Sequence, residues 1–242
     1  MAEQDKLAKV RALLATAEDE SLSEEARAAY RGRAADLMAR YGIDEALARA
    51  QGNPEERAAN VWIDVEAPYA LDKVELLAAV ANPLGCRLLR ANVRGPGERV
   101  RMLGMPGDLD RTLILYTSLL VQAELGLAVT RPPEGEDTRA FRRTWRVGFA
   151  EAIGERLAAT VAKASAEADA RSGGATSTEL VLADRDALVQ AHLNALYPKV
   201  RKGRARRLSG SGGTAGYAAG QRADIGGPNR VGPASPTRHA LS

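Results

Sequence analysis

Small apolar side chains dominate this sequence and constrain its fold more than any other feature. Alanine fills 46 of the 242 positions, whereas aromatic residues make up only 4% of the chain. Alanine favours helices and lets two helices approach closely, while the interior of a β-sandwich needs bulkier residues. The charged fraction of 27% and the hydrophobic fraction of 45% are typical of a globular protein with one or two domains. The composition therefore predicts a predominantly helical globular chain.

Residues 1–50 show the pattern of an α-helical hairpin. Apolar residues recur at helical spacing before Ser21, and Ser21 followed by Glu24 has the spacing of a capping box, which predicts a second helix. We expect Gly42 to end that second helix as a C-cap. The Gly- and Pro-containing residues 51–56 are expected to form a linker.

Residues 5–47 of this hairpin resemble a known bacterial family. The resemblance is carried by Lys6-Leu7, Lys9 to Leu14, Ala17-Glu18, Glu24 to Ala26 and Ala35 to Ile43. These residues are similar to the domain-of-unknown-function family 2786, whose most specific feature here is the Leu-Met-x-x-Tyr-Gly-Ile helix end. The family occurs in bacterial and phage-type proteins without an established activity. The resemblance therefore implies a helical module and no particular reaction.

Residues 57–198 are expected to form a small α+β unit of order β-α-β-β-α-α-β-α. Period-2 alternation and turn residues place strands at residues 61–66, 86–93, 99–103 and 178–182. Helical periodicity places helices at residues 71–81, from Asp108 to Leu127, at residues 138–170 and from Asp184 to Tyr197, with Asp108 and Asp184 as N-caps. The second and third strands should pair as an antiparallel hairpin. Phe141, Trp145 and Phe149 recur every four residues, which predicts a buried helix face.

The net charge of +3 conceals an uneven distribution along the chain. Residues 199–242 contain nine Lys or Arg residues and a single acid, Asp224, so this segment carries +8 and the preceding residues carry −5. A segment rich in positive charge and glycine lacks the large apolar groups that a core needs, so we expect a basic, Gly-rich flexible tail. Tyr217 and Ile225 indicate a short element within it that docks on the body or on a partner.

Two clusters of basic residues are candidates for binding the phosphates of a nucleic acid. The tail cluster consists of Lys199, Arg201, Lys202, Arg204, Arg206 and Arg207. The second cluster begins the helix expected at residues 138–170 and consists of Arg139, Arg142, Arg143 and Arg146. Because a helix N-terminus carries a positive partial charge, arginines there reduce helix stability, and an anionic partner would relieve that cost. Alternatively, the nearby acids Glu134, Glu136 and Asp137 neutralise the second cluster locally.

Motifs of the common catalytic and cofactor sites are missing from the sequence, including the P-loop, the H-E-x-x-H helix, the nucleophile elbow and the C-x-x-C pair. One cysteine, Cys86, and two histidines, His192 and His239, exclude a disulfide framework and a standard zinc site. We expect Cys86 to be a small buried residue and His192 to be partly packed. We expect no cofactor and no metal, although Asp64 and Glu66 share the polar face of a strand and could bind Mg²⁺.

The chain also lacks a hydrophobic signal peptide, and no apolar run approaches the 18 or so residues that a membrane span needs. These features predict a cytoplasmic protein that does not bind a membrane.

The sequence favours a binding protein over an enzyme. The leading hypothesis is an accessory protein that binds DNA or RNA non-specifically, because phosphate contacts position a protein without reading bases. One alternative is a protein-interaction module that acts through the N-terminal hairpin, with an incidental tail that only solubilises the chain. Another is an enzyme with an unrecognised site, such as Asp64 and Glu66 converging with an arginine.

Overall fold

The computed structural model of the chain describes residues 57–91, 95–172 and 177–225, except 202, 204 and 205, together with isolated positions between 9 and 47. Its elements follow in the order β1 (Ala59–Val65), α3 (Ala70–Ala81), β2 (Arg87–Ala91), β3 (Glu98–Gly104), α4 (Pro106–Val129), α5 (Thr138–Ser172), α6 (Thr178–Leu196) and α7 (Gly213–Arg222). A small sheet among long helices confirms the predominantly helical α+β class. The predicted linker at residues 51–56 lies outside the described residues.

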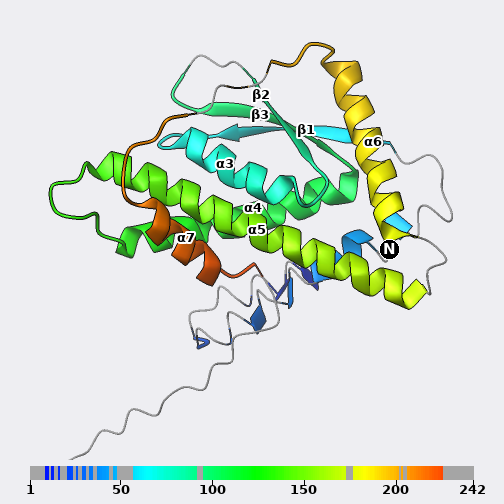
Figure 1. Ribbon diagram of the computed structural model, residues 1–242, viewed down its shortest axis with the longest axis horizontal. Helices are drawn as coiled ribbons and strands as arrows, with labels where there is room; N and C mark the ends of the chain where they lie inside the picture. Colours follow the sequence, from blue (N-terminus) through cyan, green and yellow to red (C-terminus); the bar gives the residue numbers. More distant parts are fainter. Residues whose placement is uncertain are drawn as a thin grey trace, which may run out of the picture.

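The three strands form one antiparallel sheet in the order β1-β3-β2. β2 and β3 pair as the predicted hairpin. Since side chains alternate between the two faces of a strand, Val100 and Met102 of β3 point to one face, where both are fully buried, and Arg99 and Arg101 point to the other. Figure 1 shows α3, α4 and α5 on the buried side of the sheet and α6 at one end of it.

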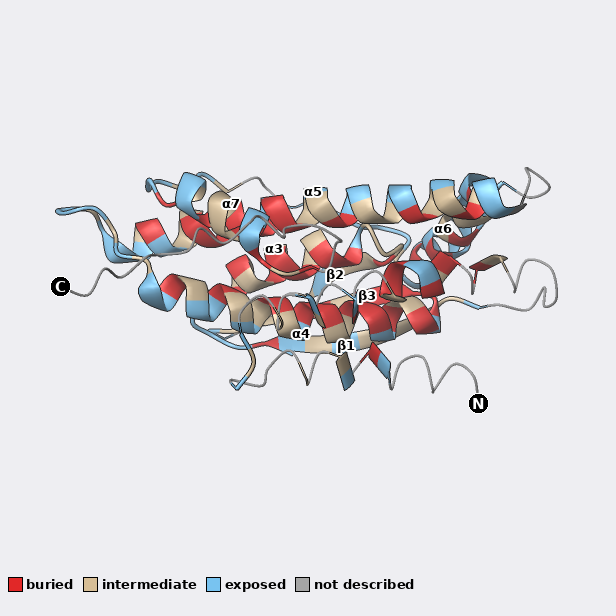
Figure 2. Ribbon diagram, turned by 90° about the horizontal axis from the view of Figure 1, so that it is seen from below, coloured by how far each residue is buried: buried red, intermediate tan, exposed pale blue. Residues whose placement is uncertain are grey.

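The core lies where α3, α4 and α5 meet. Phe141, Trp145 and Phe149 of α5 are 4%, 0% and 2% exposed, which confirms the predicted buried face. The rings of Trp145 and Phe149 stack with their centroids 5.4 Å apart. Figure 2 shows the buried residues of α5 on the side that faces α3 and α4. Burial of each ring stabilises the fold by about 2–3 kcal/mol, so α5 is the main support of the core.

Helix α4 is, among the described helices, the one long and apolar enough to cross a membrane, judged by length and composition alone. The expectation that no stretch of the chain is this apolar is therefore wrong. The same composition suits the central helix of a folded unit, and α4 contacts α3, α5, β1 and β3. Its second half leaves Val121, Leu125 and Val129 exposed on one side.

Residues 178–182, predicted as a strand, form the first turns of α6 instead. The Oγ of Ser177 accepts a hydrogen bond from the backbone N–H of Leu180 at 3.4 Å, and the Oδ1 of Asp169 accepts one from the N–H of Thr178 at 2.7 Å. These side chains satisfy N–H groups that begin a helix, so the helix starts well before Asp184, the predicted cap. The short apolar run from Leu180 to Leu182 suits a strand or a helix equally, and the caps decide between them.

The prediction of a flexible tail is wrong for its central part, because residues 213–222 form α7 and pack along α5. A Cβ on Gly216 would overlap the carbonyl oxygen of Trp145, and a Cβ on Gly220 would lie 2.6 Å from that of Phe149. The two helices therefore touch backbone to backbone, and glycine is required at these positions for close packing. Residues 226–242 lie outside the described part of the chain.

Further contacts anchor α7 at both of its ends. Before it, the backbone N–H and the hydroxyl of Ser211 donate to the Glu136 carboxylate, each at 2.6 Å. Within it, the Tyr217 hydroxyl donates to Glu155 at 2.5 Å, which raises the pKa of Tyr217. After it, Ile225 is only 2% exposed. The predicted docking element at Tyr217 and Ile225 is confirmed, and the body is what it docks on.

The described residues of the N-terminal hairpin belong to the main core. Val10, Ala34 and Met38 are at most 1% exposed and share one hydrophobic cluster with the buried faces of α3, α4 and α5. The hairpin is therefore packed on the α+β unit through its apolar residues.

Gly42 does not end a helix as predicted, because residues 37–43 are helical through Ile43. It lies against the guanidinium of Arg111, whose atoms would be 3.0–3.2 Å from a Cβ at this position. That guanidinium also lies 5.1 Å from the ring centroid of Tyr41. The glycine of the motif gives Arg111 room to cross the helix, and it does not serve as a stop signal.

Candidate nucleic-acid interface

The face of the sheet opposite the core has a covered half and an open half. In the covered half, Leu103 packs with Val189 and Leu193 of α6, and Arg87 pairs with Asp186. The strand register gives the open half two cross-strand rows, which are Trp62, Arg101 and Leu89, and then Asp64, Arg99 and Ala91. The open half is the surface on which a large ligand could lie.

Rings and guanidinium groups alternate on this open half. The guanidinium carbons of Arg99 and Arg101 lie 5.0 and 5.1 Å from the ring centroid of Trp62, and that of Arg101 lies 5.5 Å from the ring centroid of Tyr197. We call Arg99, Trp62, Arg101 and Tyr197 the cation–π ladder. Each contact contributes about 0.5–1 kcal/mol at an exposed site, so the ladder holds its side chains in a defined order. Trp62 is 42% exposed, which is unusual for so large an apolar ring.

The two arginines of the ladder differ in how their charge is met. Arg101 donates to the side-chain oxygen of Asn60 at 2.8 Å and to the Tyr197 hydroxyl at 2.6 Å, both of which are neutral groups. Arg99 pairs with Asp64 at 3.2 Å, and both side chains are largely exposed. An exposed ion pair stabilises by less than about 1 kcal/mol, so a phosphate could compete for Arg99.

The basic segment that follows α6 runs beside this open half (Figure 1). Lys199 and Arg201 are exposed. Together with Trp62, Arg101 and Tyr197 they line a hollow of about 730 Å³. Sheet and tail thus combine into one basic surface, which neither would form alone.

The remaining tail residues of the predicted interface fall into three groups. Arg207 is exposed but lies away from the hollow. Lys202 and Arg204 lie outside the described residues. Arg206 is bound by two acids of α3, as an ion pair with Asp72 Oδ1 at 2.7 Å and a hydrogen bond to Glu75 at 3.1 Å.

The environment of Arg206 shows that it is a structural residue. Partial burial disfavours its charged form, but the carboxylates of Glu75 and Asp72 outweigh this effect and raise the pKa of Arg206. Asp72 is only 2% exposed, and a buried carboxylate needs a cation beside it. This guanidinium therefore fastens the tail to α3, and its predicted contact with phosphate stays a prediction.

The arginine cluster of α5 also contains both exposed side chains and side chains that lie beside acids. Arg146 is 7% exposed and donates to both carboxylate oxygens of Glu124, at 2.6 and 2.7 Å. These hydrogen bonds lower the pKa of Glu124. Arg143 lies 3.9 Å from Asp72. Arg146 is therefore buried and bound to an acid, and its predicted contact with phosphate stays a prediction.

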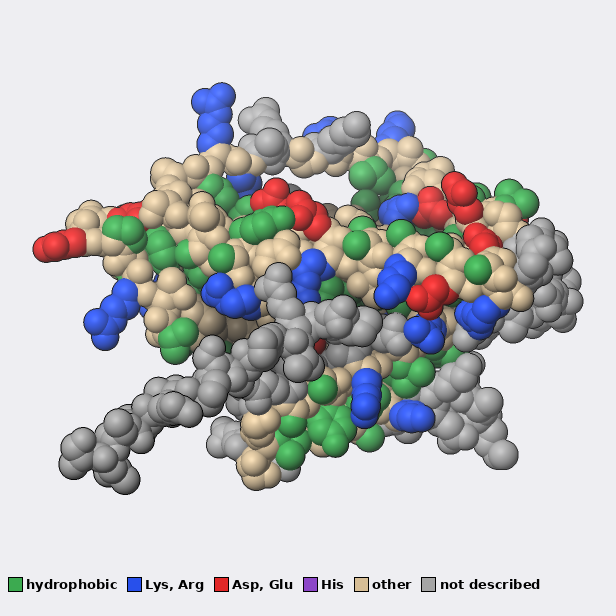
Figure 3. Space-filling view, turned by 60° about the horizontal axis from the view of Figure 1, so that its bottom comes forward, with side chains coloured by type: hydrophobic (Ala, Val, Ile, Leu, Met, Phe, Trp, Pro, Cys, Tyr) green, Lys and Arg blue, Asp and Glu red, His purple; other side chains and the backbone are tan. Residues whose placement is uncertain are grey.

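Arg139 and Arg142 are exposed, as the prediction requires. Two of the three acids expected to neutralise the cluster have other partners, since Glu136 binds Ser211 and Asp137 accepts from the backbone N–H of Ala140 at 2.7 Å. Figure 3 shows Lys and Arg interspersed with Asp and Glu over the face that carries α5. This face is therefore one of mixed charge.

Sequence reasoning missed the cation–π ladder. The alternation of β1 does place Trp62 on the polar face beside Asp64, and a large aromatic residue on such a face is a signal for a surface site. The register that sets Trp62 opposite Arg101, and the return of Tyr197 to the same place, depend on tertiary structure.

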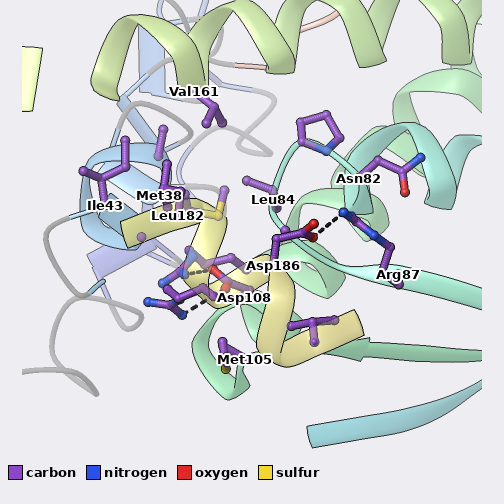
Figure 4. Close-up of a pocket in the computed structure, with 17 residues that line it drawn as sticks. Met38, Ile43, Asn82, Leu84, Arg87, Met105, Asp108, Val161, Leu182 and Asp186 are labelled. Carbon is purple, nitrogen blue, oxygen red and sulfur yellow. Dashed lines mark hydrogen bonds and ion pairs between the residues drawn. The ribbon is translucent and has the colours of Figure 1, made fainter. Parts of the chain in front are cut away.

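A second, smaller cavity of about 150 Å³ lies between the hairpin and the α+β unit (Figure 4). Asp108, predicted as a helix cap, instead accepts from Arg111 and, at 3.0 Å, from Arg185. Both guanidinium groups are at least 90% buried. Met38 and Ile43 of the hairpin form part of the apolar wall. These ion pairs sit where the hairpin meets the body, which gives them a structural role.

The remaining residues singled out from the sequence are Cys86, His192 and His239. Cys86 is fully buried, as expected, and burial raises the pKa of its thiol to about 12, so it is not a thiolate nucleophile. His192 is partly buried beside the Asn60 amide at 3.3 Å. His239 lies outside the described residues.

Asp64, Glu66 and Arg99 line one open depression at the edge of the sheet. Asp64 is exposed there and is paired with Arg99, so this depression lacks the burial of a typical acid–base site. Within the described ranges, no three His, Cys, Asp or Glu side chains come together as metal ligands.

Comparison with known proteins identifies the N-terminal module. The family model described as "Protein of unknown function (DUF2786)" matches residues 6–45, in agreement with the resemblance of residues 5–47. Neither a curated protein nor a solved structure matches the chain.

Proposed function

We propose that this protein binds nucleic acid non-specifically, through a surface formed by the open half of the sheet and the basic segment after α6. The observation that carries the proposal is the placement of exposed Lys199 and Arg201 beside Arg101, around one hollow. Arg90 and Glu98 also line the hollow, where they pair with each other at 3.0 Å, so Arg101, Lys199 and Arg201 supply its net positive charge. Such a concave surface suits a polyanion, and phosphate binding of this kind carries little sequence information.

This proposal narrows the set of residues expected to contact phosphate. Lys199 and Arg201 remain candidates, joined by Arg99 and Arg101 of the sheet. Arg206 and Arg146 leave the set, because each is bound to carboxylates. Arg139 and Arg142 of α5 are exposed and do not line the hollow, so they serve as the natural comparison.

The competing role as a protein-interaction module stays a prediction. Among the described residues of the hairpin, Val10, Ala34 and Met38 are buried in the core and so are not offered to a partner. No observation on those residues favours this role over nucleic-acid binding. A cytoplasmic location likewise stays a prediction.

The test is a salt titration of binding to a labelled oligonucleotide, with fluorescence anisotropy as the readout. A truncation at Pro198 would remove α7 together with the basic segment, so charge reversal is the cleaner change. The double variant Lys199→Glu, Arg201→Glu should weaken binding at about 50 mM salt by tenfold or more, and should reduce the slope of log K against log salt by about 2 on duplex DNA.

The matched control is Arg139→Glu, Arg142→Glu, which makes the same charge change on α5. We expect less than a threefold effect from it, which corresponds to loss of non-specific attraction alone. Equal effects of the two double variants, or no binding by the unaltered protein, would refute the proposed surface.

A further inference from the structure

The cation–π ladder offers a nucleic acid more than positive charge. Phosphate contacts need only exposed cations, yet this surface also carries the ring of Trp62, which is 42% exposed and has two guanidinium groups within 5.1 Å of its centroid. An exposed aromatic face among cations is a surface on which a nucleobase can stack.

The ladder is preorganised for stacking. Arg101 is fixed by hydrogen bonds to Asn60 and Tyr197, and the rings on either side of it, Trp62 and Tyr197, hold it in place. Arg99 covers Trp62 at the open end and is held only by an exposed pair with Asp64. A nucleobase can therefore stack on the Arg99 guanidinium or displace it from the ring, because both surfaces accept a π-system.

The hollow beside the ladder limits what form of nucleic acid can use it. Tyr197, Lys199 and Arg201 border the hollow on the side opposite the sheet, so a base that reaches Trp62 must leave its own stack and enter a concave site. In a duplex every base is paired and stacked inside, and only phosphates and groove edges are exposed. An unpaired base can turn out toward the ring while its phosphates meet Lys199 and Arg201.

We infer that the hollow is a binding site for single-stranded nucleic acid, in which an unpaired base stacks on the Trp62 ring, beside or in place of the Arg99 guanidinium, and the adjoining phosphates contact Lys199 and Arg201. The inference rests on the proposed function, and it adds a preference that charge alone does not create. Duplex binding through phosphate contacts is the competing outcome.

The experiment compares a labelled oligothymidylate with a duplex of the same length, using full-length protein. For Trp62→Ala we expect about a tenfold loss of affinity for the single strand, in line with the loss of one base-stacking contact, and less than a twofold change for the duplex. Trp62→Phe keeps a stacking ring and should retain most of the single-strand affinity.

Intrinsic fluorescence supplies a direct readout. The chain has two tryptophans, and Trp145 is fully buried in the core, so quenching by added oligothymidylate reports on Trp62. The quenching should vanish in Trp62→Phe while the circular dichroism spectrum stays unchanged. Because Trp62 lies on the surface, these variants are expected to fold.

The outcomes separate the two proposals. If Trp62→Ala weakens both ligands equally or neither of them, the stacking site is refuted, while salt-dependent binding that Lys199→Glu, Arg201→Glu abolishes would leave the proposed function standing. If the unaltered protein binds neither ligand, the proposed function fails and this inference fails with it. Selective loss of single-strand affinity supports both.

Discussion

The segment after α6 contains two stretches that look alike in composition and behave differently in the structure. Residues 199–207 are basic, and Lys199 and Arg201 among them are exposed and line the hollow beside the sheet. Residues 213–222 are rich in glycine and form α7, which is packed backbone to backbone on α5. Each has only one sizeable side chain with apolar character, Val200 or Tyr217, so the difference shows that glycine can mark close helix packing as readily as flexibility.

The basic stretch is held in place by packed elements on both sides of it. It is not a free arm, because α6 lies before it, Arg206 is fastened to α3, and α7 follows. A segment anchored on both sides loses less conformational entropy when it binds than a disordered tail would. Substitutions in the packed part should therefore lower the stability of the fold more than substitutions in the open part.

The largest effect is expected at the packed part. Gly216→Ala places a methyl group against the carbonyl of Trp145, so α7 must move away from α5, with a loss of about 3 kcal/mol in the free energy of unfolding. Urea denaturation measures it. Gly203→Ala is the matched control, since nothing lies within 4 Å of a Cβ there. Equal stability of the two variants would disprove the close packing.

The next effect is expected at the fastening residue. Arg206→Met leaves the buried carboxylate of Asp72 with Arg143 at 3.9 Å as its nearest described cation, and should lower the free energy of unfolding by about 2 kcal/mol. In a protein that already carries Asp72→Asn, Arg206→Met should lower the free energy of unfolding by much less, because no buried carboxylate is left without its cation. A double-mutant cycle that shows no coupling between the two positions would contradict this role.

The third effect concerns the inward arginine of α5 and depends on pH. Because Arg146 lowers the pKa of Glu124 below its ordinary value of 4.5, the ion pair stabilises the fold above about pH 4.5, and its contribution is lost as the pH falls through the lower, folded-state pKa. Glu124→Gln should therefore be less stable than the unaltered protein at neutral pH, by up to about 1 kcal/mol. This difference in the free energy of unfolding should disappear once the pH is below the folded-state pKa of Glu124. A difference that persists at low pH would show that lost packing is its cause.

The smallest effect on stability is expected in the open part. Arg201→Ala should change the free energy of unfolding by less than about 0.5 kcal/mol, because the side chain is exposed and no acid is paired with it among the described residues. Thermal denaturation checks this. A large loss would mean that the basic stretch supports the fold and is not available for a ligand.

Local patterns predicted much of the fold. The alternation in β1, the turn between β2 and β3, and the four-residue repeat of Phe141, Trp145 and Phe149 are signals within single elements, and the structure confirms them. The strand predicted at residues 178–182 failed because its apolar run is ambiguous and the capping by Asp169 comes from another helix.

The candidate site was less predictable from sequence, for a physical reason. Position alone cannot show whether an arginine is exposed or paired. Arg206 and Arg146 meet acids that are 131 and 22 residues away in the chain. Trp62 gains its importance from β3 and from the end of α6, which only the assembled sheet brings to it.

The contact between Gly42 and Arg111 has an evolutionary consequence. The family module contributes the glycine, and the α+β unit contributes the guanidinium that fills the space above it. The two positions should therefore vary together among relatives that combine these parts. Where a residue with a side chain replaces the glycine, we expect a smaller residue in place of the arginine. A domain joined to this module without such an arginine would need another group to cover Tyr41.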